Sequence, residues 1–139
     1  MSQADIETLR GVYEAISRGD WDAAFRDAHP GFEYKLPDRD PRVGTYRGRE
    51  EARRVLEDQL GAFEEVVAEP EEFFLRSDQI VVFLRVRSRP RGSSATIEIR
   101  IAHLWTMRDG KAARFELFPV REEALEAVGL SEQDAHADS

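Results

Sequence analysis

The segment 95–119 contains the pattern that most restricts what this chain can fold into. Apolar residues occupy every second position from 97 to 107, with one histidine among them. The chain then turns at Asp109-Gly110, and a second limb follows at 111–118. A period of two is typical of a strand with one buried face. Asp-Gly between two such runs is a strong hairpin signal. The sequence therefore predicts a β-hairpin, and with it a sheet.

Two turn lengths are compatible with this hairpin, and they place His103 opposite different residues. A two-residue loop at Asp109-Gly110 would pair His103 with Glu116. A three-residue loop, with the glycine in a left-handed bulge, would pair it with Phe115. A slip of one residue turns every side chain to the other face, so burial of the apolar residues decides between them. We predict the three-residue loop, which places Phe115 and Leu117 beside the isoleucine row and turns His103 inward.

An inward histidine on an apolar row needs a polar partner or a cavity that holds water. The ordinary pKa of histidine lies near neutrality, which suits a general acid or base. The sequence therefore makes His103 the leading candidate for a functional residue. The alternative is a buried structural histidine that is bonded to a tyrosine or to the backbone.

Composition restricts the class of protein. The chain has 139 residues, enough for one domain with a real core, and no cysteine, which excludes disulfides and thiol chemistry. The formal net charge of −8 argues against binding to nucleic acid or to an anionic membrane. No apolar run is long enough to span a bilayer, and no signal-peptide pattern occurs, so we expect a cytoplasmic protein. The small, acidic tail at 131–139 is expected to be disordered.

Helices come first in the chain, and strands dominate after them. Apolar spacing predicts a first helix that Arg18-Gly19 ends and a second helix that Asp20 caps. Pro70 lies inside a predicted strand, which indicates an edge strand or a bulge. The predicted elements are helices at 6–16, 20–28 and 49–63, strands at 32–36, 66–76, 79–89, 95–107 and 111–118, a loop at 37–48, and a short helix or turn at 121–128.

This order of elements predicts an α+β fold in which the helices pack on one face of a curved antiparallel sheet. A strongly curved sheet that is closed by helices leaves a conical space in its middle. Such a space is a natural pocket for a small molecule.

Four motifs in this order resemble the SnoaL-like proteins of the nuclear transport factor 2-like superfamily. They are Arg-Gly-Asp-Trp-Asp-Ala-Ala-Phe at 18–25, His-Pro-Gly-Phe-Glu-Tyr at 29–34, Gly-Thr-Tyr-Arg-Gly-Arg-Glu at 44–50, and His-Leu-Trp-Thr-Met-Arg-Asp-Gly-Lys at 103–111. The resemblance covers nearly the whole chain. It implies one cone-shaped α+β domain at 1–130, with a curved antiparallel sheet wrapped around the N-terminal helices.

The superfamily includes polyketide cyclases, ketosteroid isomerase, limonene epoxide hydrolase and members without known chemistry, so the fold alone does not give the function. In the isomerase, an aspartic acid on the penultimate strand donates a hydrogen bond to the substrate oxyanion, and His103 falls near that place. A carboxylate base is expected in or after the first strand, where Glu33 and Asp38 are the candidates. Cyclase-like members often have an acidic residue after the last strand, and this chain has none at 118–121.

The resemblance implies a domain that binds a small apolar or cyclic organic molecule and catalyses a proton transfer such as isomerisation, cyclisation or dehydration. The alternative is a non-catalytic ligand-binding or interaction module, which the missing acid favours. A homodimer formed through the outer face of the sheet is expected, and no cofactor or metal is implied. The catalytic candidates are His103 and Asp38, and the substrate-binding candidates are Tyr13, Trp21, Tyr34, Trp105, Phe115 and Leu117.

Overall fold

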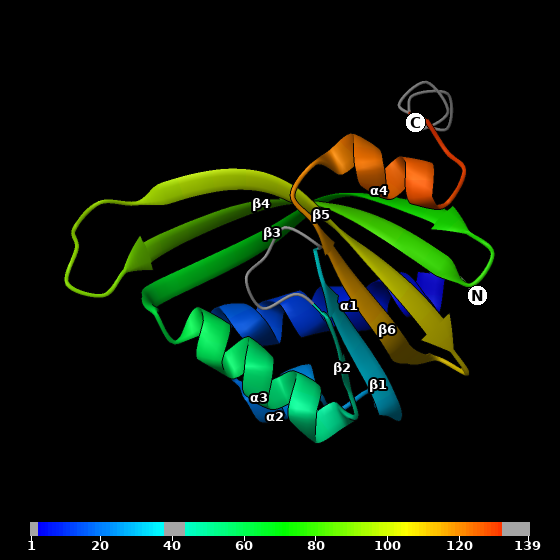
Figure 1. Cartoon of the computed structure of the whole chain (residues 1–139), viewed down its shortest axis with the longest axis horizontal. Coiled ribbons are helices and arrows are strands. Elements are labelled where there is room, and N and C mark those ends of the chain that lie inside the picture. The colour runs from blue at the N-terminus through cyan, green and yellow to red at the C-terminus, as the bar shows by residue number, and fades with distance from the viewer. Residues whose placement is uncertain (1–2, 38–43, 132–139) are drawn as a thin grey trace.

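The computed structural model describes residues 3–37 and 44–131. Asp38 and the predicted tail from residue 132 onward lie outside the described residues. The described part of the chain forms one six-stranded sheet and four helices (Figure 1). The helices are α1 (Gln3–Arg18), α2 (Trp21–Ala24), α3 (Arg49–Leu60) and α4 (Arg121–Ala127). The strands are β1 (Ala28–Leu36), β2 (Gly44–Arg47), β3 (Phe63–Arg76), β4 (Gln79–Pro90), β5 (Ile97–Arg108) and β6 (Lys111–Phe118).

The sheet is curved and does not close. Its strand order is β2-β1-β6-β5-β4-β3, and every neighbouring pair is antiparallel except β1 with β6, which run parallel. Helices α1, α2 and α3 lie against the concave face, and α4 lies on the opposite, outer face (Figure 1). The predicted α+β fold, with a curved sheet around the N-terminal helices, is confirmed, although one of its strand pairs is parallel.

Helix α1 packs one apolar face onto the sheet. Leu9, Val12 and Tyr13 recur at helical spacing and are buried. Gly19 follows with φ of 73°, the left-handed conformation that commonly ends a helix. The Asp20 carboxylate then accepts a hydrogen bond from the Ala23 backbone N–H at 3.1 Å, which caps α2 as the sequence predicted.

The first part of the chain departs from the prediction in three places. Helix α2 is a single turn, and the strand predicted at 32–36 begins four residues earlier, at Ala28. The reason is pairing: Ala28 lies opposite Ala112 of β6, and the Ala112 N–H donates to the Asp27 carbonyl oxygen. The predicted loop at 37–48 contains strand β2, which pairs with β1.

The later elements follow the prediction closely. Pro70 lies on the edge strand β3, next to an irregularity in its pairing with β4, so both features that a strand proline indicates are present. Phe63 was predicted to lie on the third helix, but it begins β3 instead. It lies opposite Pro90 at the far end of β4.

The register of the β5–β6 hairpin differs from both predicted alternatives. The turn has two residues, because Arg108 pairs with Lys111, and both Asp109 and Gly110 have positive φ. The pairing then shifts beyond Met107, and Ala113 of β6 has no partner on β5. The prediction that His103 lies opposite Phe115 is therefore wrong, since Leu117 lies there. The extra residue in β6 restores the predicted facing of Phe115 and Leu117, because one inserted residue compensates for the shorter turn.

The two faces of the sheet carry separate hydrophobic cores. The larger core lies on the concave side and includes Leu9, Tyr13, Phe32 and Trp105. On the outer side, Ala124, Leu125 and Val128 of the α4 region pack against Val81, Phe83, Ala102 and Leu104. Among the described residues, no helix combines the length and the apolar character that crossing a membrane requires.

Candidate functional site

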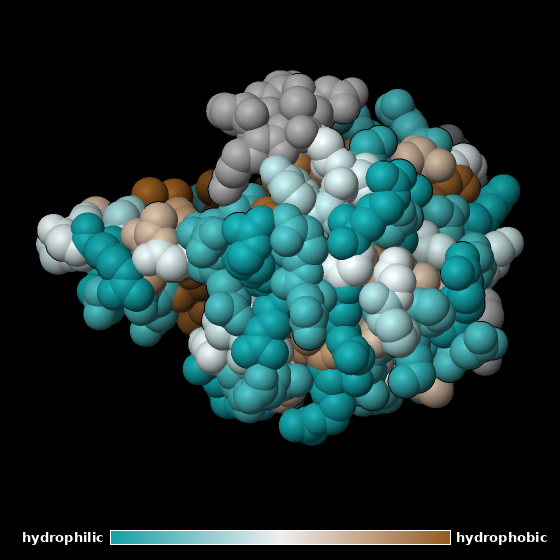
Figure 2. Space-filling model, turned by 60° about the horizontal axis from the view of Figure 1, so that its bottom comes forward, coloured by the Kyte–Doolittle hydropathy of each residue, from teal (hydrophilic) through white to brown (hydrophobic). Residues whose placement is uncertain are grey.

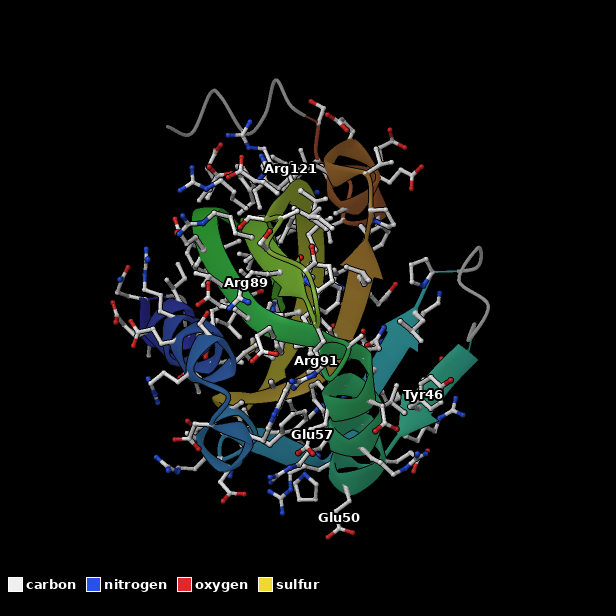
Figure 3. All side chains as sticks on the ribbon, turned by 90° about the vertical axis from the view of Figure 1, so that its left-hand side faces the viewer. Tyr46, Glu50, Glu57, Arg89, Arg91 and Arg121 are labelled. Carbon is white, nitrogen blue, oxygen red and sulfur yellow. The ribbon has the colours of Figure 1, made fainter. Side chains whose placement is uncertain are left out.

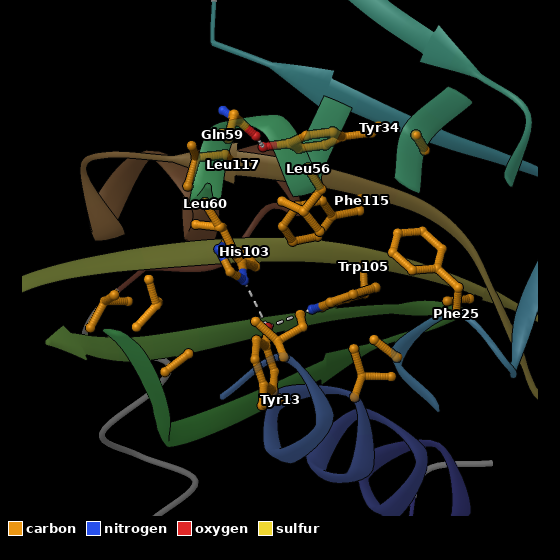
Figure 4. Close-up of a pocket in the computed structure, with 18 of the residues that line it drawn as sticks. Tyr13, Phe25, Tyr34, Leu56, Gln59, Leu60, His103, Trp105, Phe115 and Leu117 are labelled. Atoms are coloured by element: carbon orange, nitrogen blue, oxygen red, sulfur yellow. Dashed lines mark hydrogen bonds between the residues drawn. The ribbon is translucent and has the colours of Figure 1, made fainter. Parts of the chain in front are cut away.

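A cavity of about 420 Å³ lies between the concave face of the sheet and helices α1 to α3 (Figure 4). A volume of this size is typical of sites for small organic ligands. The wall is almost entirely apolar. Its polar lining residues are Tyr13, Asp27, Tyr34, Gln59, Ser88 and His103.

A short hydrogen-bonded chain joins α1 to β5 at the wall of this cavity. The Trp105 indole Nε1–H donates to the Tyr13 hydroxyl oxygen at 2.7 Å. The Tyr13 hydroxyl oxygen lies 2.8 Å from His103 Nδ1 (Figure 4). Tyr13 is fully buried and Trp105 almost so, so each of these polar groups depends on the others for its hydrogen bonds.

The direction of these bonds determines the tautomer of His103. The Tyr13 hydroxyl is buried and its proton needs an acceptor, and Nδ1 of His103 is the acceptor within reach among the described residues, so we assign the phenol proton to this bond. Nδ1 of a neutral imidazole can accept this proton only when Nε2 carries the ring hydrogen. Nε2 forms no hydrogen bond with any described residue, and His103 lines the cavity. The arrangement therefore presents an imidazole N–H donor to an apolar cavity.

Burial keeps the side chains of His103 and Tyr13 uncharged near neutral pH. The pKa of His103 is lowered from 6.5 to about 3, because removal from water disfavours the imidazolium form. The side chain keeps some exposed area, and His103 lines the cavity. Burial also raises the pKa of the Tyr13 phenol, and the hydrogen bond from Trp105 opposes this effect only in part.

A second polar pair lies across the cavity, on β1 and α3. The Tyr34 hydroxyl donates to Oε1 of Gln59 at 2.7 Å (Figure 4). The Phe115 ring lies on the cavity wall and contacts one member of each polar pair. The centroid of the Phe115 ring lies 5.0 Å from the centroid of the Tyr34 ring and 4.4 Å from that of the His103 ring. The cavity thus has polar groups on two walls and an aromatic floor.

Carboxylates and metal ligands are scarce in this site. Among the described residues that line the cavity, Asp27 is the one carboxylate, and it is exposed. Within the described ranges, no group of three or more histidine, cysteine, aspartate or glutamate residues is placed to hold a metal ion.

Comparison with known families identifies this architecture. The model of the SnoaL-like domain matches residues 9–115, which is more than half of the chain. The chain belongs to the SnoaL-like domain family. None of the curated proteins matches it.

Solved structures agree with this assignment. The SnoaL-like domain is similar to TerC, whose crystal structure was determined with polyporic acid (26% identity, 84% of this chain and 91% of that chain covered, TM-score 0.74). It is also similar to an NTF2-like protein of unknown function from Burkholderia pseudomallei (23% identity, 93% and 99% covered, TM-score 0.75). A third similar structure is a SnoaL-like polyketide cyclase from Jannaschia sp. CCS1 (18% identity, 83% and 84% covered, TM-score 0.70).

The structure brings together most of the residues that the sequence singled out. Six of them line the cavity of the SnoaL-like domain: Tyr13, Tyr34, His103, Trp105, Phe115 and Leu117. Trp21 does not line it and packs on Phe25 instead, with ring centroids 6.5 Å apart. Glu33 forms an ion pair with Arg47 at 2.8 Å, outside the cavity. Asp38 lies outside the described residues.

Sequence reasoning missed Gln59, which the structure places in the cavity wall of the SnoaL-like domain. A signal for it was present. Ala52, Val55 and Leu56 form the apolar side of α3, and Gln59 follows at the same helical spacing, so it is a polar residue on an apolar stripe.

Proposed function

We propose that this SnoaL-like domain binds a neutral, mostly apolar organic molecule that carries one hydrogen-bond acceptor, such as a carbonyl oxygen. The observation that carries the proposal is Nε2 of His103, which has an apolar cavity in front of it and no hydrogen-bond partner among the described residues. The tautomer assigned above makes this nitrogen a donor. Among the described residues, His103 Nε2 is not one of the buried side-chain nitrogens that lack a partner, so it is open to the cavity, where the acceptor of a ligand or a water can satisfy it. Aromatic walls favour a ligand with a flat ring.

One similar structure supports a small organic ligand in this fold. TerC was co-crystallised with polyporic acid, and its structure aligns with most of this chain. A protein of the same fold therefore binds a small organic molecule. Because His103 has a lowered pKa, it stays neutral near pH 7, which favours a neutral ligand over an anionic one.

Proton transfer is the second candidate function. An imidazole N–H in an apolar cavity is the kind of group that stabilises a developing oxyanion. Enolisation also needs a base, and a histidine with a pKa of about 3 is a weak one. Asp27 is the available carboxylate among the described lining residues, and Asp38 remains a prediction. Binding without catalysis needs neither of them.

Acetophenone is a suitable first probe, because it combines one aromatic ring with one carbonyl acceptor. The chain has two tryptophans, and only Trp105 lines the cavity. In a Trp21→Phe background, quenching of the remaining fluorescence therefore reports on the site. We expect saturable quenching, and we expect His103→Leu to lower the affinity about fivefold, the effect of losing one hydrogen bond of about 1 kcal/mol.

His29→Leu is the matched control, because His29 lies outside the cavity and bonds only to the Gly31 N–H. It should leave the affinity unchanged. Equal affinity of the His103→Leu variant and the parent protein would show that His103 does not bind the acceptor. Exchange of the acetophenone methyl protons in D2O, measured by NMR, separates the two functions. Exchange above the rate of buffer, lost in His103→Leu, would support the second candidate.

The homodimer and the cytoplasmic location stay predictions. The outer face of β3, β4 and β5 carries arginines that pair within the chain, such as Arg85 with Glu69 at 2.8 Å and Arg87 with Glu69 at 2.6 Å. A second copy on this face would have to accommodate these ion pairs.

A further inference from the structure

The β4–β5 hairpin extends beyond the helices that cover the rest of the concave face (Figure 1). Its inner side carries two large apolar side chains that remain exposed, Ile97 and Ile99, each at 47%. Few large hydrophobic residues of the described chain are this exposed. Figure 2 shows hydrophobic surface on this projecting arm and in the recess where it meets the body of the molecule.

These isoleucines continue the wall of the cavity. Residues 97, 99, 101 and 103 share one face of β5, because side chains of a strand alternate. Ile99, Ile101 and His103 all line the cavity, whereas Ile97 lies beyond it. The row from His103 to Ile97 is about 20 Å long, at about 3.4 Å per residue. An apolar track therefore runs from the histidine out of the cavity and along the arm.

The turn at the outer end of the arm is fixed to the residues that follow α3. The Arg91 backbone N–H donates to the Ala62 carbonyl oxygen at 3.1 Å, and the Arg91 side chain donates to the Gly61 carbonyl oxygen at 2.7 Å. Its guanidinium also contacts Glu64 at 3.0 Å. Figure 3 shows Arg91 where the arm meets the end of α3. The track is therefore held in place before any ligand arrives.

The opposite side of the arm has a different character. Glu98 and Arg100 point outward and lie within 4 Å of oppositely charged side chains, Arg85 at 3.9 Å and Glu71 at 3.8 Å. Apolar side chains are thus confined to the face that continues the cavity. This distribution favours an occupant that starts inside the cavity.

We propose that the ligand of this domain has a polar, ring-containing head at His103 and a long unbranched apolar tail that lies on Ile101, Ile99 and Ile97. This inference rests on the proposed function, since it extends the same ligand. Water is displaced from both exposed isoleucines when the tail binds, so affinity grows with chain length until the tail has passed Ile97.

A series of phenyl alkyl ketones tests the tail separately from the head. Acetophenone, octanophenone and dodecanophenone share the head and differ only in chain length. The dodecanophenone chain, fully extended, reaches from His103 to about the position of Ile99, a distance of about 14 Å along the strand. Affinity should rise by up to about fourfold for each methylene that becomes buried. We expect this rise both from acetophenone to octanophenone and from octanophenone to dodecanophenone.

The double variant Ile97→Thr/Ile99→Thr keeps β-branched side chains, so the strand is retained. It should weaken dodecanophenone, whose chain reaches Ile99, about threefold more than it weakens acetophenone. Leu75→Thr is the matched control, since Leu75 is 40% exposed on a strand but does not line the cavity. It should change neither affinity.

Each other outcome has a definite meaning. Acetophenone binding without any gain between octanophenone and dodecanophenone overturns the tail and leaves the proposed function standing. Failure of all three ketones to bind overturns the proposed function itself. A wild-type dimer that becomes monomeric in the double variant, measured by sedimentation velocity, would show that a second copy of the chain covers the isoleucines, and it also overturns the tail.

Discussion

The hydroxyl of Tyr13 stands between the indole of Trp105 and the imidazole of His103, and it completes the hydrogen bonding of both. All three side chains contribute aromatic surface to the same cavity wall. A change at the phenol therefore affects the position and the protonation of the histidine, even though Tyr13 and His103 lie on different elements.

We expect Tyr13→Phe to lower the free energy of unfolding by about 2 kcal/mol, because it leaves two buried polar atoms without partners. In a His103→Leu background the same change should cost about 1 kcal/mol less, since one of those atoms is already gone. A double-mutant cycle in urea measures the coupling. Additive costs would contradict the proposed hydrogen-bonded chain.

The lowered pKa of His103 gives a second prediction at this scale. Because the folded pKa of about 3 lies below the ordinary value of 6.5, the unfolded chain binds a proton more readily in acid. The stability contributed by the neutral histidine is complete above about pH 6.5 and is lost as the pH falls toward 3. The wild type should therefore lose stability relative to His103→Leu over this range, which urea titrations at several pH values measure.

Ligand binding provides the check on that prediction. The Nε2–H donor persists while the ring is neutral, so acetophenone affinity should stay constant from about pH 5 to 8. An affinity that changes with a midpoint near 6.5 would show that His103 titrates normally and that the cavity does not exclude water from it.

At the scale of elements, α4 is fastened to the outer face of the sheet by the first residue of the helix. The Arg121 guanidinium donates to the Leu84 carbonyl oxygen at 2.8 Å and to the Ile101 carbonyl oxygen at 3.3 Å. It also donates a hydrogen bond to the Glu71 carboxylate at 2.6 Å, and its Cζ atom lies 4.8 Å from the centroid of the Phe83 ring. This one side chain joins α4 to strands β3, β4 and β5.

We predict that Arg121→Met lowers the free energy of unfolding by about 2 kcal/mol, because the apolar stem is kept and the charged hydrogen bonds are lost. Arg47→Met is the control: its ion pair with Glu33 is on an exposed side chain and should be worth less than about 1 kcal/mol. Acetophenone binding should be unaffected in both variants, since neither residue lines the cavity.

The pH dependence of Arg121→Met distinguishes lost hydrogen bonds from lost packing. The hydrogen bond from Arg121 is the largest cause of the lowered pKa of Glu71, whose ordinary value is 4.5. This contribution is present above about pH 4.5 and is lost as the pH falls through the folded pKa. The stability difference between wild type and variant should narrow in acid. A difference that does not change with pH would assign the effect to packing.

The elements that sequence reasoning found are those with long, regular patterns. The alternation on β5 was enough to turn His103 inward, and the glycine after Arg18 was enough to end α1. Strand β2 was missed because four residues are too few to show a period. The bulge at Ala113 was missed because nothing local marks it. The bulge is needed because β5 and β6 must turn their apolar side chains to the same face of the sheet.

At the scale of the whole molecule, the sequence predicted the wall of the site better than its polar groups. Apolar periodicity determines which face of each element turns inward, so five of the six proposed ligand-binding residues line the cavity. The hydrogen-bonded chain Trp105–Tyr13–His103 could not be derived in this way, because it depends on how α1 lies across β5. Gln59 depends in the same way on how α3 lies over β1.

The parallel pairing of β1 with β6 has a consequence for how the chain acquires its shape during synthesis. Ala28 lies opposite Ala112, so β1 has its place in the sheet beside a strand that leaves the ribosome much later. Such distant pairings form slowly, because a long loop must close before they give any stability. In a nascent chain that stops before Lys111, β1 and β2 lack β6, the strand that connects them to β5, β4 and β3.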